Sequence, residues 1–317
     1  MNQIIKKKMT LICSIIVCMA SFIGCKGDEM YEKEMYHPVI YLLSNGTDNV
    51  YTVVIPFKED KAVNYFSVGC GGSLPNPEEV VIELEPDTVL YDKYNRMNFD
   101  NEDSYARFLP AHCYEISSYR VVLPANSPEQ YVKVPVKINQ QGLSPDSIYF
   151  VPVAIKSVSK YEVNPDKYNM LFRIAVENDY AEQINTTVYY QRGITISGST
   201  PTPITGSKMV YPLSKDEVRM FAGTRTQTSK TTLAEINTYS IVAKINADST
   251  VVIHPYGTIE VEQLDDEAYN RYYTMLNAEN KTVDYIDLYY RFRTLVSTNP
   301  DVYSNWSEIK ESLQRMN

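Results

Sequence analysis

Short apolar runs separated by turn residues fill the first half of the chain after residue 36. The turn between the first two runs contains Asn45-Gly46, a dipeptide typical of tight β-hairpins. The runs are residues 37–43, 50–57, 62–68, 80–84, 120–123, 130–138, 148–157 and 170–176. Because strands at this spacing without long amphipathic helices are typical of antiparallel sandwiches, we predict a β-sandwich over residues 36–180. Residues 88–97 are compatible with one or two helical turns.

A second β-rich series follows a charged break at residues 178–183. Its runs are residues 186–196, 238–245, 248–254, 258–263, 269–276 and 283–293. Ser214 and Glu217 have the spacing of a capping box, which predicts a helix starting there. Trp306, Ile309, Leu313 and Met316 recur at helical spacing, which predicts a docked C-terminal helix near residues 305–315. We therefore expect an all-β chain whose second domain, residues 184–317, is barrel-like and ends in a helix.

The N-terminus has the pattern of an export signal. Three lysines, Lys6 to Lys8, precede sixteen uncharged and mostly apolar residues, too few for the roughly 20 that span a bilayer. Gly24-Cys25 closes this run and resembles the lipobox of bacterial lipoproteins. The resemblance implies removal of residues 1–24 and acylation of Cys25, leaving residues 25–35 as a lipidated tether. Several acyl chains, at about 0.8 kcal/mol per buried CH2, would anchor the protein in a membrane.

The run Lys26-Gly27-Asp28-Glu29 follows the expected anchor directly. It is similar to the surface-export signal of Bacteroides-type lipoproteins, and an ordinary solvated linker is the alternative. The resemblance implies an outer-membrane location facing the cell exterior.

Charge and cysteine content narrow the possible partners. The first 24 residues hold three of the 30 Lys and Arg and none of the 39 Asp and Glu, so the remaining chain has a net charge of −12. Such a chain is not drawn to nucleic acid or anionic lipid by electrostatics. Cys70 and Cys113 are the only cysteines beyond Cys25, and either one disulfide or two buried thiols fits them.

Tyrosine is unusually abundant, at 27 residues against nine Phe and one Trp. Tyrosine suits strands, and its flat ring with a polar tip also suits binding surfaces. Tyrosine doublets occur at positions 189/190, 272/273 and 289/290, and on a strand one ring of each doublet faces outward. Outward rings can stack on sugars while neighbouring polar groups bond hydroxyls. The candidate ligand-binding residues are Tyr190, Tyr272, Tyr273, Tyr289, Arg271 and Arg291.

No catalytic or metal-binding constellation emerges. The pairs Glu78/Glu79 and Asp265/Asp266 are adjacent, so on a strand their side chains would point to opposite faces. Residues 284–287 partly resemble the acidic strand of chitinase-like glycosidases, but no Glu follows at the required step. The three histidines lie on distant segments without a ligand motif. We expect no enzyme activity, no cofactor and no metal.

Two groups of strand motifs carry a family resemblance. Residues 131–136, 142–147 and 149–155 are similar to the immunoglobulin-like N-terminal domain of Bacteroides-type surface lipoproteins from glycan-utilisation loci. The same domain precedes catalytic modules in some endoglycosidases. Residues 188–193 and 287–292 are similar to a β-rich C-terminal domain of unknown function that often accompanies it. These motifs are structural and supply no catalytic residue.

The resemblance implies a system like the starch-utilisation apparatus, where surface lipoproteins hold glycans near an outer-membrane importer. The expected function is therefore non-catalytic binding of an oligo- or polysaccharide, with the importer and other surface lipoproteins of the system as partners. The alternative is a structural or adhesive surface lipoprotein that binds a protein and whose tyrosines belong to the core.

Overall fold

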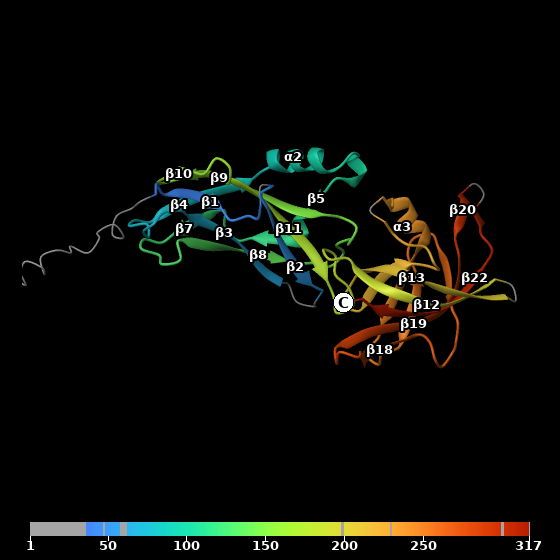
Figure 1. Cartoon of the computed structure of the whole chain (residues 1–317). Helices are drawn as coiled ribbons and strands as arrows, with labels where there is room; N and C mark the ends of the chain where they lie inside the picture. Colours follow the sequence, from blue (N-terminus) through green and yellow to red (C-terminus); the bar gives the residue numbers. More distant parts are fainter. Residues whose placement is uncertain are drawn as a thin grey trace, which may run out of the picture.

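The computed structural model describes residues 36–46, 48–57, 62–197, 200–228, 230–298 and 301–316. The expected signal segment, Cys25 and the tether through residue 35 lie outside these residues. No helix within the described ranges is both long and apolar enough to cross a membrane. The chain is mostly β, and a sandwich and a curled sheet lie next to each other along the long axis of the molecule (Figure 1).

Two sheets form the N-terminal sandwich. The five-stranded sheet has the order β10 (Glu162–Val163), β1 (Val39–Leu42), β3 (Ala62–Cys70), β8 (Tyr131–Ile138) and β6 (Tyr114–Ile116). The six-stranded sheet has the order β2 (Val50–Pro56), β11 (Asn169–Glu177), β9 (Tyr149–Val158), β4 (Val80–Pro86) and β7 (Arg120–Leu123), and β5 (Arg107–Phe108) pairs with β9. Three pairings, β1–β10, β2–β11 and β5–β9, are parallel, unlike the antiparallel sandwich that we expected.

Alternating apolar residues from both sheets meet in one core. In β8, for example, Val134, Val136 and Ile138 are buried, whereas the residues between them are exposed. Phe66 and Phe172 face each other across the core, with ring centroids 5.9 Å apart. Cys70 and Cys113 are both buried in this core as thiols, which decides the disulfide question.

Short helices accompany the sandwich. They are α2 (Val89–Asn98), η2 (Glu102–Ser104) and η3 (Ala111–Cys113). Residues 88–97, compatible in sequence with one or two helical turns, coincide to within one residue with α2, which has ten residues and is therefore longer than two turns. Its buried Asn95 bonds both backbone groups of Ala106, which fixes the helix against the chain leading to β5.

The C-terminal part is one nine-stranded sheet that curls on itself. Its order is β16 (Val251–Pro255), β15 (Ser240–Ile245), β14 (Glu217–Phe221), β13 (Thr200–Pro212), β12 (Thr187–Ser197), β22 (Ser307–Arg315), β19 (Thr282–Arg293) and β17 (Glu260–Gln263), with β18 (Arg271–Leu276) also pairing with β19. The Ile253 amide of β16 donates to Gln263 Oε1 of β17 at 2.9 Å and so links the two ends of the sheet. This nearly closed sheet is hereafter the barrel, and its shape confirms the barrel-like expectation.

Three smaller elements complete the barrel. They are α3 (Leu233–Tyr239), β20 (Leu295–Thr298) and β21 (Asp301–Tyr303). Strands β20 and β21 form a separate hairpin that projects from the end of the molecule away from the sandwich (Figure 1).

The predicted C-terminal helix is wrong, because residues 307–315 form β22 between β12 and β19. Ile309 and Leu313 are four apart, and that spacing places two side chains on one side of both a helix and a strand. The residue midway between them, Glu311, distinguishes a strand from a helix, because only a strand points it to the same side. Glu311 is fully buried with Ile309 and Leu313, so the strand has a polar residue at one of its three core positions.

Glu311 belongs to a buried polar network inside the barrel. Its Oε1 lies 2.8 Å from Lys208 Nζ and accepts from the Tyr290 hydroxyl at 2.8 Å, while its Oε2 accepts from Gln191 Nε2 at 2.5 Å. Lys208 also donates to the Phe221 carbonyl at 3.0 Å. Burial lowers the pKa of Lys208, and the Glu311 carboxylate opposes that shift. The network ties together β12, β13, β19 and β22.

The helix predicted from Ser214 and Glu217 is also wrong. The Ser214 hydroxyl does reach the Glu217 carboxylate, at 3.2 Å, but the Leu213 amide donates to the Glu217 carbonyl and closes a turn into β14. A true capping box occurs at Thr232 and Glu235, where it starts α3. The two side chains there bond each other's backbone amides reciprocally, at 3.2 and 2.9 Å.

A buried ion pair connects the sandwich to the barrel. Arg219 of β14 donates from Nη2 to Asp146 Oδ1 at 2.7 Å, and Asp146 lies in the loop before β9. Arg219 is fully buried, and its guanidinium lies 4.8 Å from the Tyr211 ring centroid and 5.5 Å from that of Tyr256. Burial raises the pKa of Asp146 more than Arg219 lowers it.

Candidate functional site

Strand β19 separates the interior of the barrel from its outer surface. Ile286, Leu288 and Tyr290 are buried in the core, so the odd-numbered side chains of β19 project outward. Together with neighbours on β12, β17, β18 and β22, and in the segments that precede β18 and β22, they form a surface that we call the outer face. Its members are Tyr190, Arg192, Glu260, Glu262, Asp266, Tyr269, Arg271, Tyr273, Tyr285, Asp287, Tyr289, Arg291, Arg293, Trp306, Glu308 and Lys310.

A row of tyrosines crosses one end of the outer face. Tyr190 of β12 and Tyr285 of β19 lie opposite the same residue of β22, Gln314, and Tyr273 of β18 pairs with Tyr285. The Tyr273 and Tyr285 rings are stacked, with centroids 5.1 Å apart and planes 6° from parallel. The Arg192 guanidinium lies 4.9 Å from the Tyr190 ring centroid. The row therefore presents half-buried rings from three strands.

The next row combines Arg271 with Asp287. Arg271 Nε lies 3.5 Å from Asp287 Oδ2, and its guanidinium lies 5.2 Å from the Tyr273 ring centroid. Asp287 is buried, and within the described part of the chain its Oδ1 has no hydrogen-bond partner. Burial, followed by the charge of Asp287, raises the pKa of Tyr273.

Tyr289 and Lys310 occupy the middle of the outer face. The Tyr289 hydroxyl donates to Glu308 Oε1 at 2.7 Å, and this bond is the main reason that the pKa of Tyr289 is raised. Lys310 Nζ lies 4.2 Å from the Tyr289 ring centroid and donates to Asp266 Oδ2 at 2.7 Å. That bond raises the pKa of Lys310 and lowers the pKa of Asp266.

Trp306 lies at the opposite end from the tyrosine row. Its ring centroid is 4.8 Å from the Arg291 guanidinium and 4.9 Å from that of Arg293. Both arginines reach carboxylates of β17, Arg291 Nε to Glu262 at 2.6 Å and Arg293 Nε to Glu260 at 2.5 Å. From Tyr285 to Arg293 the strand rises about 3.3 Å per residue, so the outer face is about 26 Å long. It is long enough for a chain of several sugar rings.

The structure brings together five of the six residues proposed from the sequence. Tyr190, Tyr273, Tyr289, Arg271 and Arg291 share the outer face. Tyr272 lies on the other side of β18, where its hydroxyl donates to Asp284 Oδ1 at 2.8 Å. Its ring packs edge-on against the Tyr180 ring, with the two ring centroids 5.1 Å apart. The doublet rule itself predicts this separation, since neighbours on a strand point to opposite faces.

Sequence reasoning missed three aromatic members of the outer face, Tyr269, Tyr285 and Trp306. Tyr269 lies in the loop before β18, where its ring centroid is 6.1 Å from that of Tyr289. Tyr285 belongs to no doublet, but it is two residues before Asp287 and four before Tyr289, so the period of a strand would have included it. Trp306 was assigned to a docked helix, and it joins the outer face because β22 is a strand.

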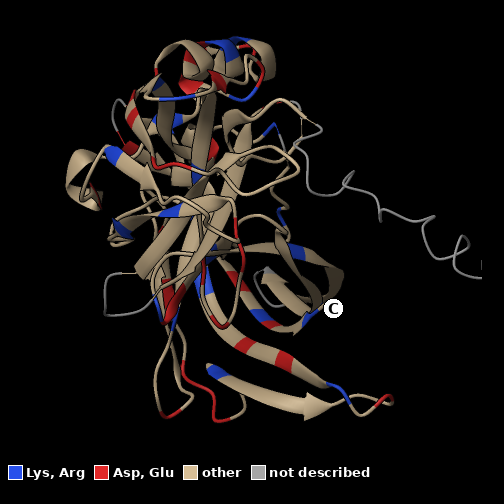
Figure 2. Ribbon diagram, turned by 90° about the vertical axis from the view of Figure 1, so that its left-hand side faces the viewer, with Lys and Arg blue, Asp and Glu red and all other residues tan. Residues whose placement is uncertain are grey.

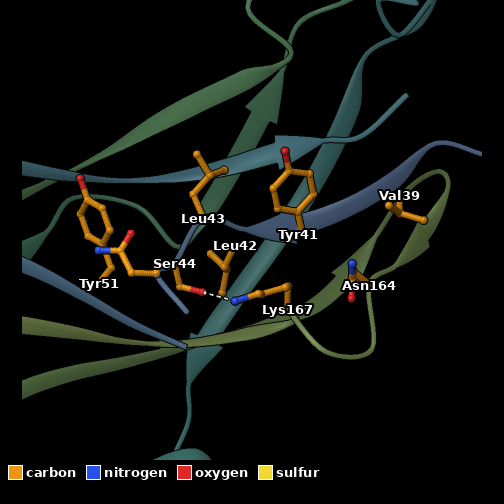
Figure 3. A pocket seen from close by; sticks show the side chains of 9 residues that line it. Val39, Tyr41, Leu42, Leu43, Ser44, Tyr51, Asn164 and Lys167 are labelled. Atoms are coloured by element: carbon orange, nitrogen blue, oxygen red, sulfur yellow. Dashed lines mark hydrogen bonds between the residues drawn. The ribbon is translucent and has the colours of Figure 1, made fainter. Parts of the chain in front are cut away.

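Two of the cavities that the described residues form lie outside this face. One, of about 390 Å³, is in the sandwich beside β1, with Tyr41, Leu43 and Tyr51 among its lining residues (Figure 3). Its Lys167 donates to Ser44 Oγ at 3.2 Å and to the Gly46 carbonyl at 2.6 Å. These bonds give the lysine a structural role, which is to hold the loop after β1. The other, of about 710 Å³, lies at one end of the barrel beside Asp284 and Arg315. In the described ranges, no three His, Cys, Asp or Glu residues are grouped so that they could hold a metal ion.

Comparison with known proteins finds relatives for both halves of the chain. A family model for an N-terminal domain matches residues 31–162, and one for a C-terminal domain matches residues 168–314. No curated protein matches the chain.

Several solved structures share the fold along nearly the whole length. A Bacteroides ovatus protein of unknown function is 16% identical with a TM-score of 0.67, over 89% of this chain and 96% of that one. An auxiliary nutrient binding protein from Bacteroides thetaiotaomicron is 14% identical with a TM-score of 0.58, over 86% of this chain and 92% of that one. In both halves and in their order, the chain is therefore similar to a family of two-domain Bacteroides proteins.

Proposed function

We propose that this protein is a non-catalytic surface lipoprotein that binds an oligo- or polysaccharide on the outer face of its barrel and delivers it to an outer-membrane importer. The observation that carries the proposal is the set of half-buried rings on one sheet surface, interleaved with hydrogen-bonding charged groups. Rings supply flat apolar area, and the charged groups can bond hydroxyls around it.

The geometry also suits an extended ligand. The rings of Tyr273 and Tyr285 and the ring of Trp306 lie toward opposite ends of the outer face, with Tyr289 between them. A glycan lying along β19 would contact all three places, and contacts linked along one chain add their binding energies more effectively than separate ones. The description of one structural relative as a nutrient binding protein supports the same class of function.

The experiment is affinity electrophoresis and calorimetry on the chain from residue 26 onward, which contains every described residue, against a panel of polysaccharides. Retention by one polysaccharide should be weakened at least tenfold by Tyr273→Ala with Tyr285→Ala, since each stacking contact contributes about 1 kcal/mol or more. Tyr65→Ala is the matched control, because Tyr65 is an exposed strand tyrosine on the sandwich.

Two outcomes would contradict the proposal. If no polysaccharide is retained, or if the Tyr273/Tyr285 double variant binds as the parent does, the outer face is not the binding site. If reducing ends are released from the retained polysaccharide, the protein is an enzyme.

The anchor has its own test. Cys25→Ala should stop lipidation, so the processed protein should leave the membrane fraction. Neutral replacements of Lys26, Asp28 and Glu29 should keep the anchor but reduce protease accessibility on whole cells. A Cys25→Ala protein that is processed and still sediments with membranes would contradict the lipoprotein proposal.

One observation favours the second candidate, a lipoprotein that adheres to a protein. Two hairpins expose large apolar side chains, Met275 and Leu276 at the end of β18, and Val296 and Val302 on β20 and β21. Leu276 and Val296 are 67% and 69% exposed, so a protein partner that covered them would remove their apolar area from water. If Leu276→Ser with Val296→Ser abolishes association with a surface protein while glycan retention is absent in the parent, the adhesive function holds.

A further inference from the structure

Resting on the glycan-binding function proposed above, we propose that the outer face selects uncharged glycans, and that Glu260 and Glu262 exclude acidic ones. The starting observation is that four of the five cations on the described outer face, all but Arg192, lie against carboxylates. Arg291 and Arg293 bond Glu262 and Glu260, and Lys310 bonds Asp266. Arg271 lies 3.5 Å from Asp287.

The total charge of the outer face is balanced as well. Its basic members are Arg192, Arg271, Arg291, Arg293 and Lys310, and its acidic members are Glu260, Glu262, Asp266, Asp287 and Glu308. The five positive and five negative charges cancel, although the full chain has a net charge of −9. Figure 2 shows both signs intermixed on the strands of the barrel. The face therefore has no net field to attract or hold a strongly charged polymer.

Paired charges suit neutral sugars for a geometric reason. A hydroxyl group both donates and accepts hydrogen bonds, a guanidinium only donates and a carboxylate only accepts. Two neighbouring hydroxyls can therefore accept from Arg291 and donate to Glu262 without breaking the pair. Beside them, the Trp306 ring offers apolar area to the sugar ring, and Arg291 and Arg293 are held against that ring.

Acidic sugars meet the opposite situation. A uronate or sulfate that approaches Arg291 or Arg293 comes equally close to Glu262 or Glu260, because the carboxylates lie within hydrogen-bond distance of the same guanidinium groups. It must either tolerate like-charge repulsion or displace an existing ion pair. A binding site rejects a competitor efficiently when it places such a repulsive group next to the attractive one.

The test uses polymer pairs that share a backbone and differ in charge. The probes are methyl-esterified and de-esterified homogalacturonan, hydroxyethyl and carboxymethyl cellulose, and dextran and dextran sulfate, each in affinity electrophoresis at low salt. The parent protein should be retained by neutral members only. Glu260→Gln with Glu262→Gln should gain retention by acidic members of about fivefold, and the gain should disappear between ~0.05 M and ~0.5 M salt.

The sandwich offers a matched control. Glu83 and Glu85 are also two residues apart on one strand, and each has an exposed ion pair, with Arg120 and Lys156 respectively. Glu83→Gln with Glu85→Gln removes the same total charge from the chain but leaves the outer face intact. It should gain no retention by acidic polymers.

The outcomes separate selectivity from glycan binding itself. Stronger retention of the parent by acidic than by neutral members overturns the selectivity while the proposed glycan binding stands. Absence of any gain in the Glu260/Glu262 variant, or an equal gain in the Glu83/Glu85 control, overturns the role of these carboxylates. If no polymer of either kind retains the parent, and none in the wider panel does, both proposals fail together. Unchanged far-ultraviolet circular dichroism and urea-unfolding midpoints check that the variants remain folded.

Discussion

The sandwich and the barrel are both built of strands, but they fill their interiors differently. Between its two sheets the sandwich packs apolar side chains such as Phe66, Ile82 and Phe172. Its buried polar residues include Asn49, Asp87 and Asn169, which lie next to or at strand ends and bond one another without a buried cation among them. The barrel core combines apolar residues with the buried Lys208 and Glu311 and their hydrogen-bond partners. Apolar packing tolerates gradual change, whereas a buried charge is stable only when all of its partners are present. The barrel should therefore respond to single changes more abruptly than the sandwich.

The two regions carry separate natural probes for this comparison. Trp306 is the single tryptophan of the chain and lies on the barrel. Cys70 and Cys113 are buried thiols of the sandwich. Tryptophan fluorescence therefore reports unfolding of the barrel, and thiol reactivity reports unfolding of the sandwich.

The largest effect is expected from breaking the buried pair. Glu311→Gln removes the charge that compensates Lys208 and should lower the free energy of unfolding of the barrel by about 3–5 kcal/mol. Urea unfolding followed by Trp306 fluorescence measures it. The double variant Lys208→Met with Glu311→Leu should recover most of the loss, because it leaves no uncompensated charge. A cost below about 1 kcal/mol for Glu311→Gln would show that the barrel depends on apolar packing, as the sandwich does.

The second-largest effect is expected at alkaline pH, where the barrel should lose more stability than the sandwich. Burial raises the pKa of Tyr189, Tyr272 and Tyr290 above the ordinary value of 10.0. From Tyr180 onward eight tyrosines are shifted upward, against Tyr94 and Tyr119 in the sandwich.

The direction of this pH effect on the free energy of unfolding depends on whether the folded or the unfolded chain binds more protons. Below pH 10 both the folded and the unfolded chain keep these phenol protons, so they add no pH dependence. Above pH 10 the unfolded chain releases them first, and the free energy of unfolding falls as pH rises, by up to about 1.4 kcal/mol per pH unit for each such tyrosine. Tyr189→Phe should remove one such contribution from the barrel. An equal loss of unfolding free energy at high pH, by Trp306 fluorescence and by thiol reactivity, would contradict the expected difference between barrel and sandwich.

A small cavity in the sandwich gives a moderate effect. Ile82 is fully buried, and Ile82→Val should lower the free energy of unfolding of the sandwich by about 1 kcal/mol. Thiol reactivity of Cys70 and Cys113 in urea should shift to lower concentration, while Trp306 fluorescence should not. A shift of both probes together would mean that the two regions unfold as one unit, joined through Asp146 and Arg219.

The smallest effect is expected from an exposed pair on the outer face. Glu262 and Arg291 are each nearly half exposed, so Glu262→Gln should change stability by less than about 1 kcal/mol. Urea unfolding by Trp306 fluorescence again measures it. A cost close to that of Glu311→Gln would show that the outer face stabilises the barrel, and would weaken its assignment as a binding surface.

Most of the sandwich strands could be predicted from the sequence because they are short apolar runs between turn residues, and in some of them apolar and polar residues alternate. Residues 131–138 carry Val, Val and Ile at every second position with Lys and Pro between them, and this pattern alone indicates a strand with one buried face. The parallel pairings could not be predicted, since they join segments far apart along the chain. The candidate tyrosines and arginines were found because their clustering is visible in the sequence, even though their shared surface is not.

By itself, the sequence determined that the chain is rich in strands and where most of those strands lie, because local alternation of apolar and polar residues depends only on neighbours. Only the tertiary structure decided that Glu311 points inward, since its burial requires Lys208, Gln191 and Tyr290 from three other strands. The same is true of the outer face. Trp306, Tyr289 and Tyr273 join it because β22 and β18 pair with β19, and pairing register is a property of the folded sheet.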